Sequence, residues 1–230
     1  MRILASLVLA LGLVLAIVGC QYILPRQEFE PSGTQFNLNS MIQVTDIAGA
    51  TTGYDPTGLF TLELKGKSLG SGVESDVLPA GLLFRSSNRE VQHMILVRDY
   101  SIAVPAGHDT VIAIGVFCCN SSRAVPNDTD RYTIGPVTDN SDLQTIVAIT
   151  KHKSLGPSNV SLVQDAIWSV TDGDGLTQGM TDSLNALPER TPRTAGDIRF
   201  GPLPAGFFEL RKTDALARFR PARRDSPQRR

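Results

Sequence analysis

The chain has 230 residues, of which 20 are Gly, 14 are Pro and 6% are aromatic. This composition argues against a helical bundle and favours many short strands joined by turns. The formal net charge is -1, but the last twenty residues contain eight Lys or Arg and two Asp, so a basic tail follows a mildly acidic body. A chain of this length can bury one sizeable core or two small ones.

The first twenty residues predict export. Met1 and Arg2 form a short positive segment, and residues 3–18 are almost unbroken Leu, Ala, Val and Ile, which is the layout of a secretory signal peptide. The run ends in Ile17-Val18-Gly19-Cys20. This sequence resembles the bacterial lipobox, in which a peptidase cuts before a cysteine that carries a diacylglycerol. The resemblance implies a signal peptide at residues 1–19 and a lipidated N-terminus at Cys20. An ordinary cleaved signal and an uncleaved anchor helix are the alternatives.

The lipid anchor sets the expected surroundings of the protein. We expect the chain to be exported and held by its lipid at a bacterial membrane, either the outer membrane or the outer face of the cell membrane. Residues 20–32 would be the tether. Residues 211–230 are rich in Arg, contain two Pro and have few apolar residues, which predicts a disordered basic tail. A surface protein or polymer is the expected ligand, and nucleic acid is not expected as a partner of a lipid-anchored exported protein.

Residues 33–136 have the pattern of an antiparallel β-sandwich. Apolar and polar residues alternate at 60–65, which predicts a half-buried strand. Residues 110–119 are apolar on both faces, which predicts a central strand covered on each side. Further strands are expected at residues 81–84, 91–99 and 101–104, the last followed by a turn at 105–107, with short edge strands at 34–38 and 41–47. The predicted fold class is mainly β, an antiparallel β-sandwich with a small appended subdomain of two or three helices.

The helical subdomain is expected at residues 137–188. Its first helix follows a polar cap at residues 139–141, and its second follows a cap at Ser158 and Asn159. Each helix has one apolar stripe. The stripes are Leu143, Ile146, Val147 and Thr150 in the first helix, and Val163, Ala166, Ile167 and Val170 in the second. A short third helical turn follows, and residues 189–210 are expected to return as a strand and loop.

Cys118 and Cys119 are adjacent thiols at the end of the predicted central strand. Neighbouring residues of a strand point to opposite faces, so Cys118 shares a face with Val116, and Cys119 with Phe117. A disulfide between them is awkward, because consecutive α-carbons lie about 3.8 Å apart, below the usual disulfide range. One thiol is expected to be plain core. The other lies at the strand end, where another group could meet it.

No catalytic residue, metal site or cofactor motif emerges from the sequence, and we expect a protein that is not an enzyme. Residues 66–70, Gly-Lys-Ser-Leu-Gly, have the letters of a nucleophile elbow, but no helix is predicted after them. A Gly-rich hairpin loop is favoured there, and an extracytoplasmic hydrolase using Ser68 is the alternative. Asp172 and Asp174 suggest a calcium loop that lacks its first ligand and closing Glu, so a turn is the simpler interpretation. The histidines, at positions 93, 108 and 152, show no metal-ligand spacing.

A partial resemblance covers residues 117–173. A strand cysteine, Cys118 or Cys119, and the helical segment 163–168, Val-Gln-Asp-Ala-Ile-Trp, resemble the thioester domain of bacterial surface adhesins, whose glutamine lies in the sequence TQxAIW. In that family the cysteine and glutamine side chains condense with loss of ammonia, and a target amine opens the bond to give a covalent link. The resemblance implies a bond between Gln164 and one of the two cysteines, supported by Trp168. Here Val163 replaces the family's Thr, and the interval from cysteine to glutamine is much shorter.

Two interpretations of Gln164 stay open at this point. On a helix, Gln164 shares a face with Val160, Ile167 and Trp168, and such dry surroundings protect a thioester from water. In the simpler interpretation no bond forms. Gln164 then hydrogen-bonds backbone groups where the helix meets the strand, and Trp168 supplies buried area. Both interpretations give a lipid-anchored envelope or surface protein with a non-catalytic binding or structural role.

Overall fold

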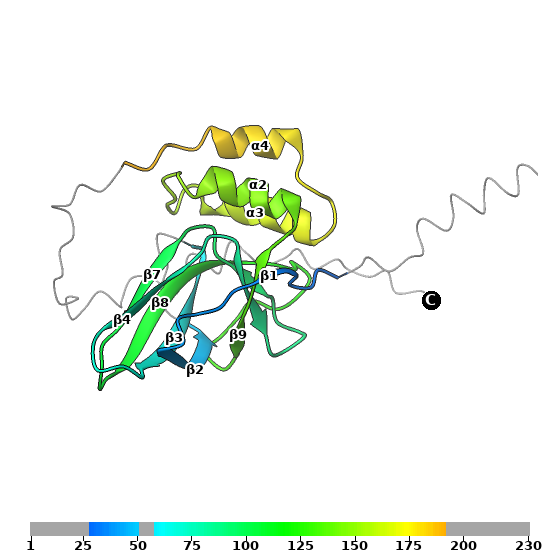
Figure 1. Cartoon of the computed structure of the whole chain (residues 1–230). Helices are drawn as coiled ribbons and strands as arrows, with labels where there is room; N and C mark the ends of the chain where they lie inside the picture. Colours follow the sequence, from blue (N-terminus) through cyan, green and yellow to red (C-terminus); the bar gives the residue numbers. More distant parts are fainter. Residues whose placement is uncertain (1–27, 51–57, 192–230) are drawn as a thin grey trace, which may run out of the picture.

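The computed structural model describes residues 28–50 and 58–191. Along the described chain the strands come first and the helices last (Figure 1). In chain order they are β1 (Gly33–Gln35), β2 (Ile42–Gly49), β3 (Phe60–Ser68), β4 (Glu74–Leu78), β5 (Leu82–Ser86), β6 (Met94–Ile95), β7 (Tyr100–Val104), β8 (Asp109–Cys118), β9 (Tyr132–Thr138), α2 (Ser141–Thr150), α3 (Val160–Thr171) and α4 (Gln178–Asn185).

The strands form two antiparallel sheets. The larger has the order β1-β9-β5-β6-β8-β3-β2, and the smaller consists of β4 and β7. β1 and β2 lie at the two edges of the larger sheet, as the sequence predicts for the first two strands. The predicted fold class is confirmed, because the described chain is mainly β and sandwich-like. Figure 1 shows the three helices grouped together over one end of the strands.

Two apolar clusters lie on opposite faces of the larger sheet, and we call them the sandwich core and the helix-side core. Neighbouring strand residues enter different clusters: Phe84 and Val116 belong to the sandwich core, whereas Leu83 and Phe117 belong to the helix-side core. Helices α2 and α3 supply most of the remaining helix-side core. Strands that are apolar on both faces are therefore found where helices cover the sheet.

The two main helices form where the sequence predicts them. Asn140 caps α2, because its Oδ1 accepts hydrogen bonds from the N–H groups of Asp142 and Leu143. The buried residues of α2 are the predicted stripe, Leu143, Ile146, Val147 and Thr150. The predicted stripe of α3 is buried as well, together with Gln164. The third helical turn is a longer element than predicted, the two-turn helix α4.

The sheet differs from the prediction in several places. Residues 91–99 contain only the short strand β6. Before it, the N–H of Gln92 donates to Ala124, which belongs to no strand, whereas after it the N–H of Leu96 still donates to Leu82 of β5. The first half of β8 is covered on one face only, and Val111 is 57% exposed. Strands β4 and β9 were not predicted, since polar residues in β4 and a Gly-Pro pair in β9 obscure the alternating pattern.

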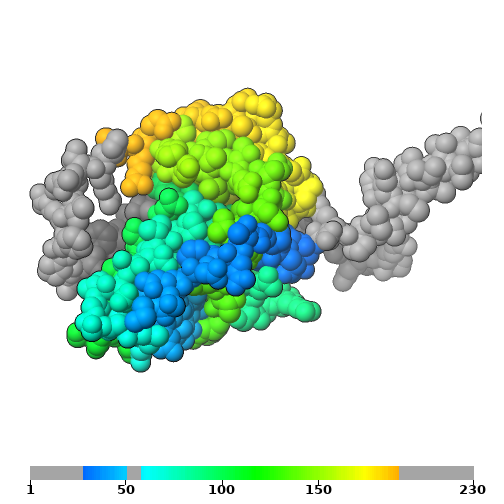
Figure 2. All heavy atoms as spheres, viewed as in Figure 1, coloured from blue at the N-terminus to red at the C-terminus, as the bar shows by residue number. Residues whose placement is uncertain are grey.

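Part of the predicted tether lies against the body. Arg85 Nη2 donates to the carbonyl oxygen of Pro31 at 3.0 Å, and Ser32 Oγ donates to Asp139 at 2.9 Å. Figure 2 shows the first described residues, in the darkest blue, lying on the molecule beside the helices. The predicted signal peptide, Cys20, most of the predicted returning strand and loop at 189–210, and the predicted basic tail lie outside the described residues. Within the described ranges, no helix combines the length and apolar character needed to cross a membrane.

Candidate functional site

The structure places Gln164 of α3 against Cys118, the last residue of β8. The N–H of Cys118 donates to Gln164 Oε1 at 2.9 Å, and Gln164 Nε2 donates to the carbonyl oxygen of Cys118 at 2.7 Å. Gln164 is fully buried, with 0% of its surface exposed. Two predicted partners that lie 46 positions apart therefore meet, and they meet through the main chain of the cysteine.

The side chain of Gln164 forms the hydrogen bonds to Cys118 that a neighbouring strand would form. Strand β3 pairs with β8 only as far as Phe60 opposite Val116, and Cys118 is the next residue of β8 whose backbone groups face that edge. A glutamine side chain has a donor and an acceptor arranged like those of a peptide group. It therefore satisfies both buried backbone groups of Cys118, as the simpler interpretation of Gln164 requires.

The two thiols lie on opposite faces of the sheet, as strand alternation predicts. Cys118 belongs to the sandwich core and Cys119 to the helix-side core, and both are free and fully buried. Burial, with a smaller contribution from Cys119, raises the pKa of Cys118 well above its ordinary value. Burial, followed by the nearby charge of Asp172, raises the pKa of Cys119. Because the thiolate is the nucleophilic form, neither thiol is activated in this closed arrangement.

Trp168 lies one helical turn after Gln164 on α3. It packs against the sandwich core and donates its Nε1–H to Gln92 Oε1 at 3.0 Å. The hydroxyl of Tyr132 donates to the carbonyl oxygen of Gln92 at 3.1 Å, and burial is the main cause that raises the pKa of Tyr132. The Gln164–Cys118 contact thus lies beside further buried polar groups that have hydrogen-bond partners.

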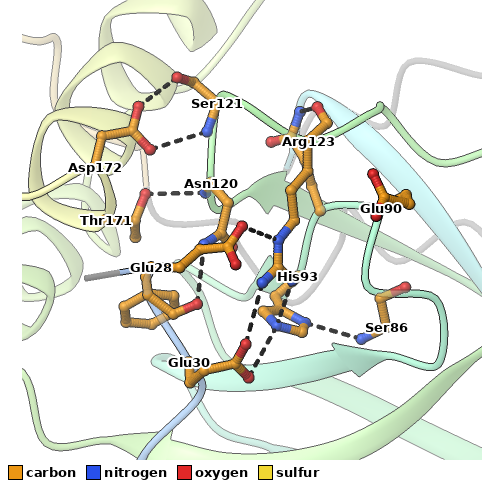
Figure 3. A network of polar contacts seen from close by, with 12 residues as sticks. Glu28, Glu30, Ser86, Glu90, His93, Asn120, Ser121, Arg123, Thr171 and Asp172 are labelled. Carbon is orange, nitrogen blue, oxygen red and sulfur yellow. Dashed lines mark hydrogen bonds and ion pairs between the residues drawn. The ribbon is translucent and has the colours of Figure 1, made fainter. Parts of the chain in front are cut away.

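A second polar cluster, which the sequence did not reveal, lies where residues 28–30 meet the body (Figure 3). Arg123 Nε donates to Glu28 at 2.8 Å, and Arg123 Nη2 donates to Glu30 at 3.1 Å. The Arg123 side chain is 4% exposed, whereas those of Glu28 and Glu30 are 56% and 62% exposed. The only sequence signal is the alternation Glu28-Phe29-Glu30, which places both acids on one side of an extended chain.

His93 completes this cluster rather than standing alone. Its Nδ1 accepts the N–H of Ser86 at 3.0 Å, so the proton of the neutral ring is assigned to Nε2, which lies 3.4 Å from Glu30. Arg123 Nη1 lies 2.9 Å from the same nitrogen. Burial, and then the positive charge of Arg123, lower the pKa of His93 below its ordinary value. The ring is therefore held neutral beside a buried cation.

Asn120 connects the end of β8 to this second cluster. It is 1% exposed and has a left-handed backbone, with φ of 67°. Its N–H donates to Thr171 Oγ1 at 3.1 Å, and its Nδ2 donates to the carbonyl oxygen of Phe29 at 2.9 Å. The next residue, Ser121, donates through both its N–H and its hydroxyl to the carboxylate of Asp172. These contacts hold the turn after β8 against the end of α3 (Figure 3).

The remaining candidate motifs have structural roles in the described chain. Ser68 ends β3 and hydrogen-bonds to backbone atoms of Gly70 and Gly72. The loop leads to β4, which pairs with β7 instead of β3, so the segment is a connecting loop and not the predicted hairpin. The segment with Asp172 and Asp174 is a turn in which both glycines have positive φ. Across residues 28–50 and 58–191, no group of three His, Cys, Asp or Glu side chains could hold a metal ion.

The fold and these contacts define a mainly β, sandwich-like protein with a helical layer and a buried glutamine–cysteine contact. Comparison of the chain with protein-family models, with curated proteins and with solved structures gives no match.

Proposed function

We propose that this chain is an exported, lipid-anchored envelope protein with a non-catalytic binding or structural role. The observation that carries the proposal is Ile17-Val18-Gly19-Cys20 at the end of an apolar run. The described fold begins at Glu28, and the chain between Cys20 and Glu28 can span at most about 30 Å. An anchor at Cys20 would therefore hold the domain close to the bilayer, with the surface around Arg123 nearest to it.

Fatty-acid labelling tests the anchor. The full chain is produced in a bacterial host supplied with alkyne-tagged palmitate, and label is measured in membrane and soluble fractions. We expect a labelled, membrane-bound protein, and we expect Cys20→Ser to lose both the label and the membrane fraction. Cys118→Ala is the matched control and should stay labelled. Label that persists in Cys20→Ser, or an unlabelled parent chain, would reject the proposal.

A second and more specific candidate is a covalent adhesin with an internal thioester between Cys118 and Gln164. The hydrogen bonds that hold the Gln164 carboxamide against Cys118 favour it. Cys118 is preferred to Cys119, because Trp168, on the same face of α3 as Gln164, packs against the core that contains Cys118. Cys118 Sγ would bond to Gln164 Cδ, the Cδ–Nε2 bond would break, and the thiol proton would leave with the nitrogen as ammonia. An amine of a target would later form an amide at Cδ and return the proton to sulfur.

Two features of the contact act in opposite directions on this chemistry. The N–H of Cys118 donates to Gln164 Oε1, where negative charge would develop during attack, and such a donor stabilises that charge. The raised pKa of Cys118 opposes formation of the thiolate. A purely structural role for Gln164 uses the same two hydrogen bonds, so the covalent state itself must be measured.

Intact mass distinguishes the two states. The chain from Gln21 to Arg230 is purified without reductant or amines and weighed before and after treatment with methylamine. A thioester gives a mass short by one ammonia, and methylamine then adds to it. Cys118→Ala should abolish this deficit, and Cys119→Ala should keep it. The unmodified mass in the parent chain would reject the thioester and leave the anchor proposal standing.

A further inference from the structure

The segment of residues 28–32, which we call the strap, is held on the body mainly by polar contacts. Glu28 and Glu30 both bind Arg123, one at Nε and the other at Nη2. Phe29, between them, packs against the helix-side core. The two carboxylates of the strap therefore lie at Arg123 (Figure 3), whereas the aromatic ring between them lies at the helix-side core.

The cationic slot that receives the strap is built by other parts of the fold. Arg123 lies in a turn whose backbone is fixed by hydrogen bonds from Arg123 N–H to Asn120 and from Ala124 N–H to Glu90. Gln92 Nε2 also donates to the carbonyl oxygen of Arg123 at 3.1 Å. His93 is oriented by the N–H of Ser86. None of these contacts involves the strap, so the backbone of the turn and the His93 ring keep these bonds when the strap is absent.

The docked strap covers the end of β8. Asn120 Nδ2 donates to the carbonyl oxygen of Phe29 at 2.9 Å, and Asn120 directly follows Cys119. Phe29 packs against the cluster that contains Cys119, whereas Cys118 belongs to the cluster on the other face of the sheet. Departure of the strap would therefore open a path for water to Cys119 before Cys118.

Two observations indicate that the outer part of the strap, residues 28–30, is held weakly, whereas Pro31 and Ser32 keep their own hydrogen bonds to Arg85 and Asp139. The carboxylates of Glu28 and Glu30 are more than half exposed, so water competes with Arg123 for them and salt screens their attraction to it. In addition, Asn120 Oδ1 is buried and has no hydrogen-bond partner among the described residues. A buried acceptor without a partner is unfavourable, and opening the strap would give it water.

We propose that the strap is a lid that controls access to Cys119. The cationic slot at Arg123 holds the lid closed by binding its two carboxylates. The contacts that hold the lid involve neither Cys20 nor a bond between Cys118 and Gln164. The lid therefore depends neither on the lipid anchor nor on a thioester. The lid adds to the proposed function a movable segment that lies beside the Gln164–Cys118 contact.

The rate of thiol alkylation tests the lid. The full chain carrying Cys20→Ser retains two of its three cysteines, and each modified cysteine is identified by peptide mapping after treatment with a maleimide. We expect the double variant Glu28→Gln, Glu30→Gln to be alkylated at Cys119 about tenfold faster than the parent, as loss of two weak ion pairs implies. Raising the salt concentration should accelerate the parent and leave the double variant unchanged.

Controls separate the lid from general loss of stability. Glu63→Gln removes one charge from β3, away from the strap, and should leave the rate unchanged. Phe29→Ala removes the apolar contact of the strap without changing its charge and should also accelerate alkylation of Cys119, so it decides the matter if the double variant fails to fold. The proposal would be overturned if Cys119 were alkylated at equal rates in the parent, the double variant and Phe29→Ala. Equal acceleration at Cys118 and Cys119 would also overturn it. A chain that holds a thioester would show one thiol fewer, so failure of the lid and failure of the thioester are distinguishable.

Discussion

The two polar sites at the end of β8 differ in how much water reaches them. The Gln164–Cys118 contact is closed, because both backbone groups of Cys118 and both ends of the carboxamide are paired and fully buried. At the strap, a buried Arg123 is paired with carboxylates that are more than half exposed. Breaking hydrogen bonds in dry surroundings costs free energy, whereas ion pairs whose carboxylates face solvent are screened by water and salt. The first site is therefore expected to hold the fold together and the second to open.

Loss of Gln164 is expected to have the largest effect. Gln164→Ala leaves the N–H and carbonyl groups of Cys118 unpaired in a buried position and adds a cavity, and together these should lower the free energy of unfolding by about 3–5 kcal/mol. Urea denaturation measures the change. Gln144→Ala, at an exposed position of α2 that donates one hydrogen bond to the carbonyl oxygen of Thr138, is the matched control and should lower it by about 1 kcal/mol. Equal effects at the two positions would contradict the contrast between the sites.

Trp168→Phe should have the next largest effect. The variant keeps most of the apolar side chain but leaves Gln92 Oε1, in a residue that is 2% exposed, without its donor. We expect the free energy of unfolding to fall by about 1–2 kcal/mol. Combining Trp168→Phe with Gln92→Met removes both partners, and the two losses should not add. Strict additivity would show that the hydrogen bond contributes nothing to the closed site.

The stability of the second site should depend on pH through His93. Burial and Arg123 lower the pKa of His93 in the folded state from its ordinary value of 6.5, so the unfolded chain binds more protons below about pH 6.5. Stability contributed by neutral His93 is therefore complete above that pH and is lost as the pH falls toward the lowered folded pKa. Arg85, Arg123, Glu28 and Glu30 are the charged groups that act on this ring. Thermal unfolding of the parent and of His93→Gln between pH 7 and 5 measures it, and the variant should show the shallower loss.

Neutralising the strap should have the smallest effect on global stability. Glu28→Gln and Glu30→Gln are each expected to lower the free energy of unfolding by at most about 1 kcal/mol, because both carboxylates are well exposed to solvent. The loss should disappear in high salt. Urea denaturation at low and high salt concentration measures it. A loss as large as that of Gln164→Ala would remove the distinction between a closed site and an opening one.

Much of the fold could be predicted from periodicity, and much of the second site could not. The stripes of α2 and α3 are readable because they bury one face at helical spacing, and the opposite faces of Cys118 and Cys119 follow from strand alternation. Strand β9 was missed because Gly135 and Pro136 interrupt its pattern, although antiparallel partners on both sides hold it in the sheet. Periodicity depends on residues that are close in sequence, whereas strand pairing depends on residues that are far apart in it. Periodicity therefore does not predict pairing.

The Arg123 cluster shows the same limit for the site. Glu28 precedes Arg123 by 95 positions, and nothing in the residues around either one indicates the other. The sequence predicted that Gln164 would meet Cys118 or Cys119, yet the choice of Cys118, and of its main chain as the contact, required the packing of α3 on β8.

The sequence by itself determined the mainly β class, the two long helices with their buried stripes, and the opposite orientation of the adjacent thiols. These features depend on neighbours within a few positions along the chain, where backbone geometry sets which side chains share a face. Only the tertiary structure decided which edge of β8 Gln164 completes, and that Glu28 and Glu30 lie on Arg123 and His93. Those contacts join segments far apart in sequence, and they form because buried backbone and charged groups take whichever partner the folded chain brings within reach.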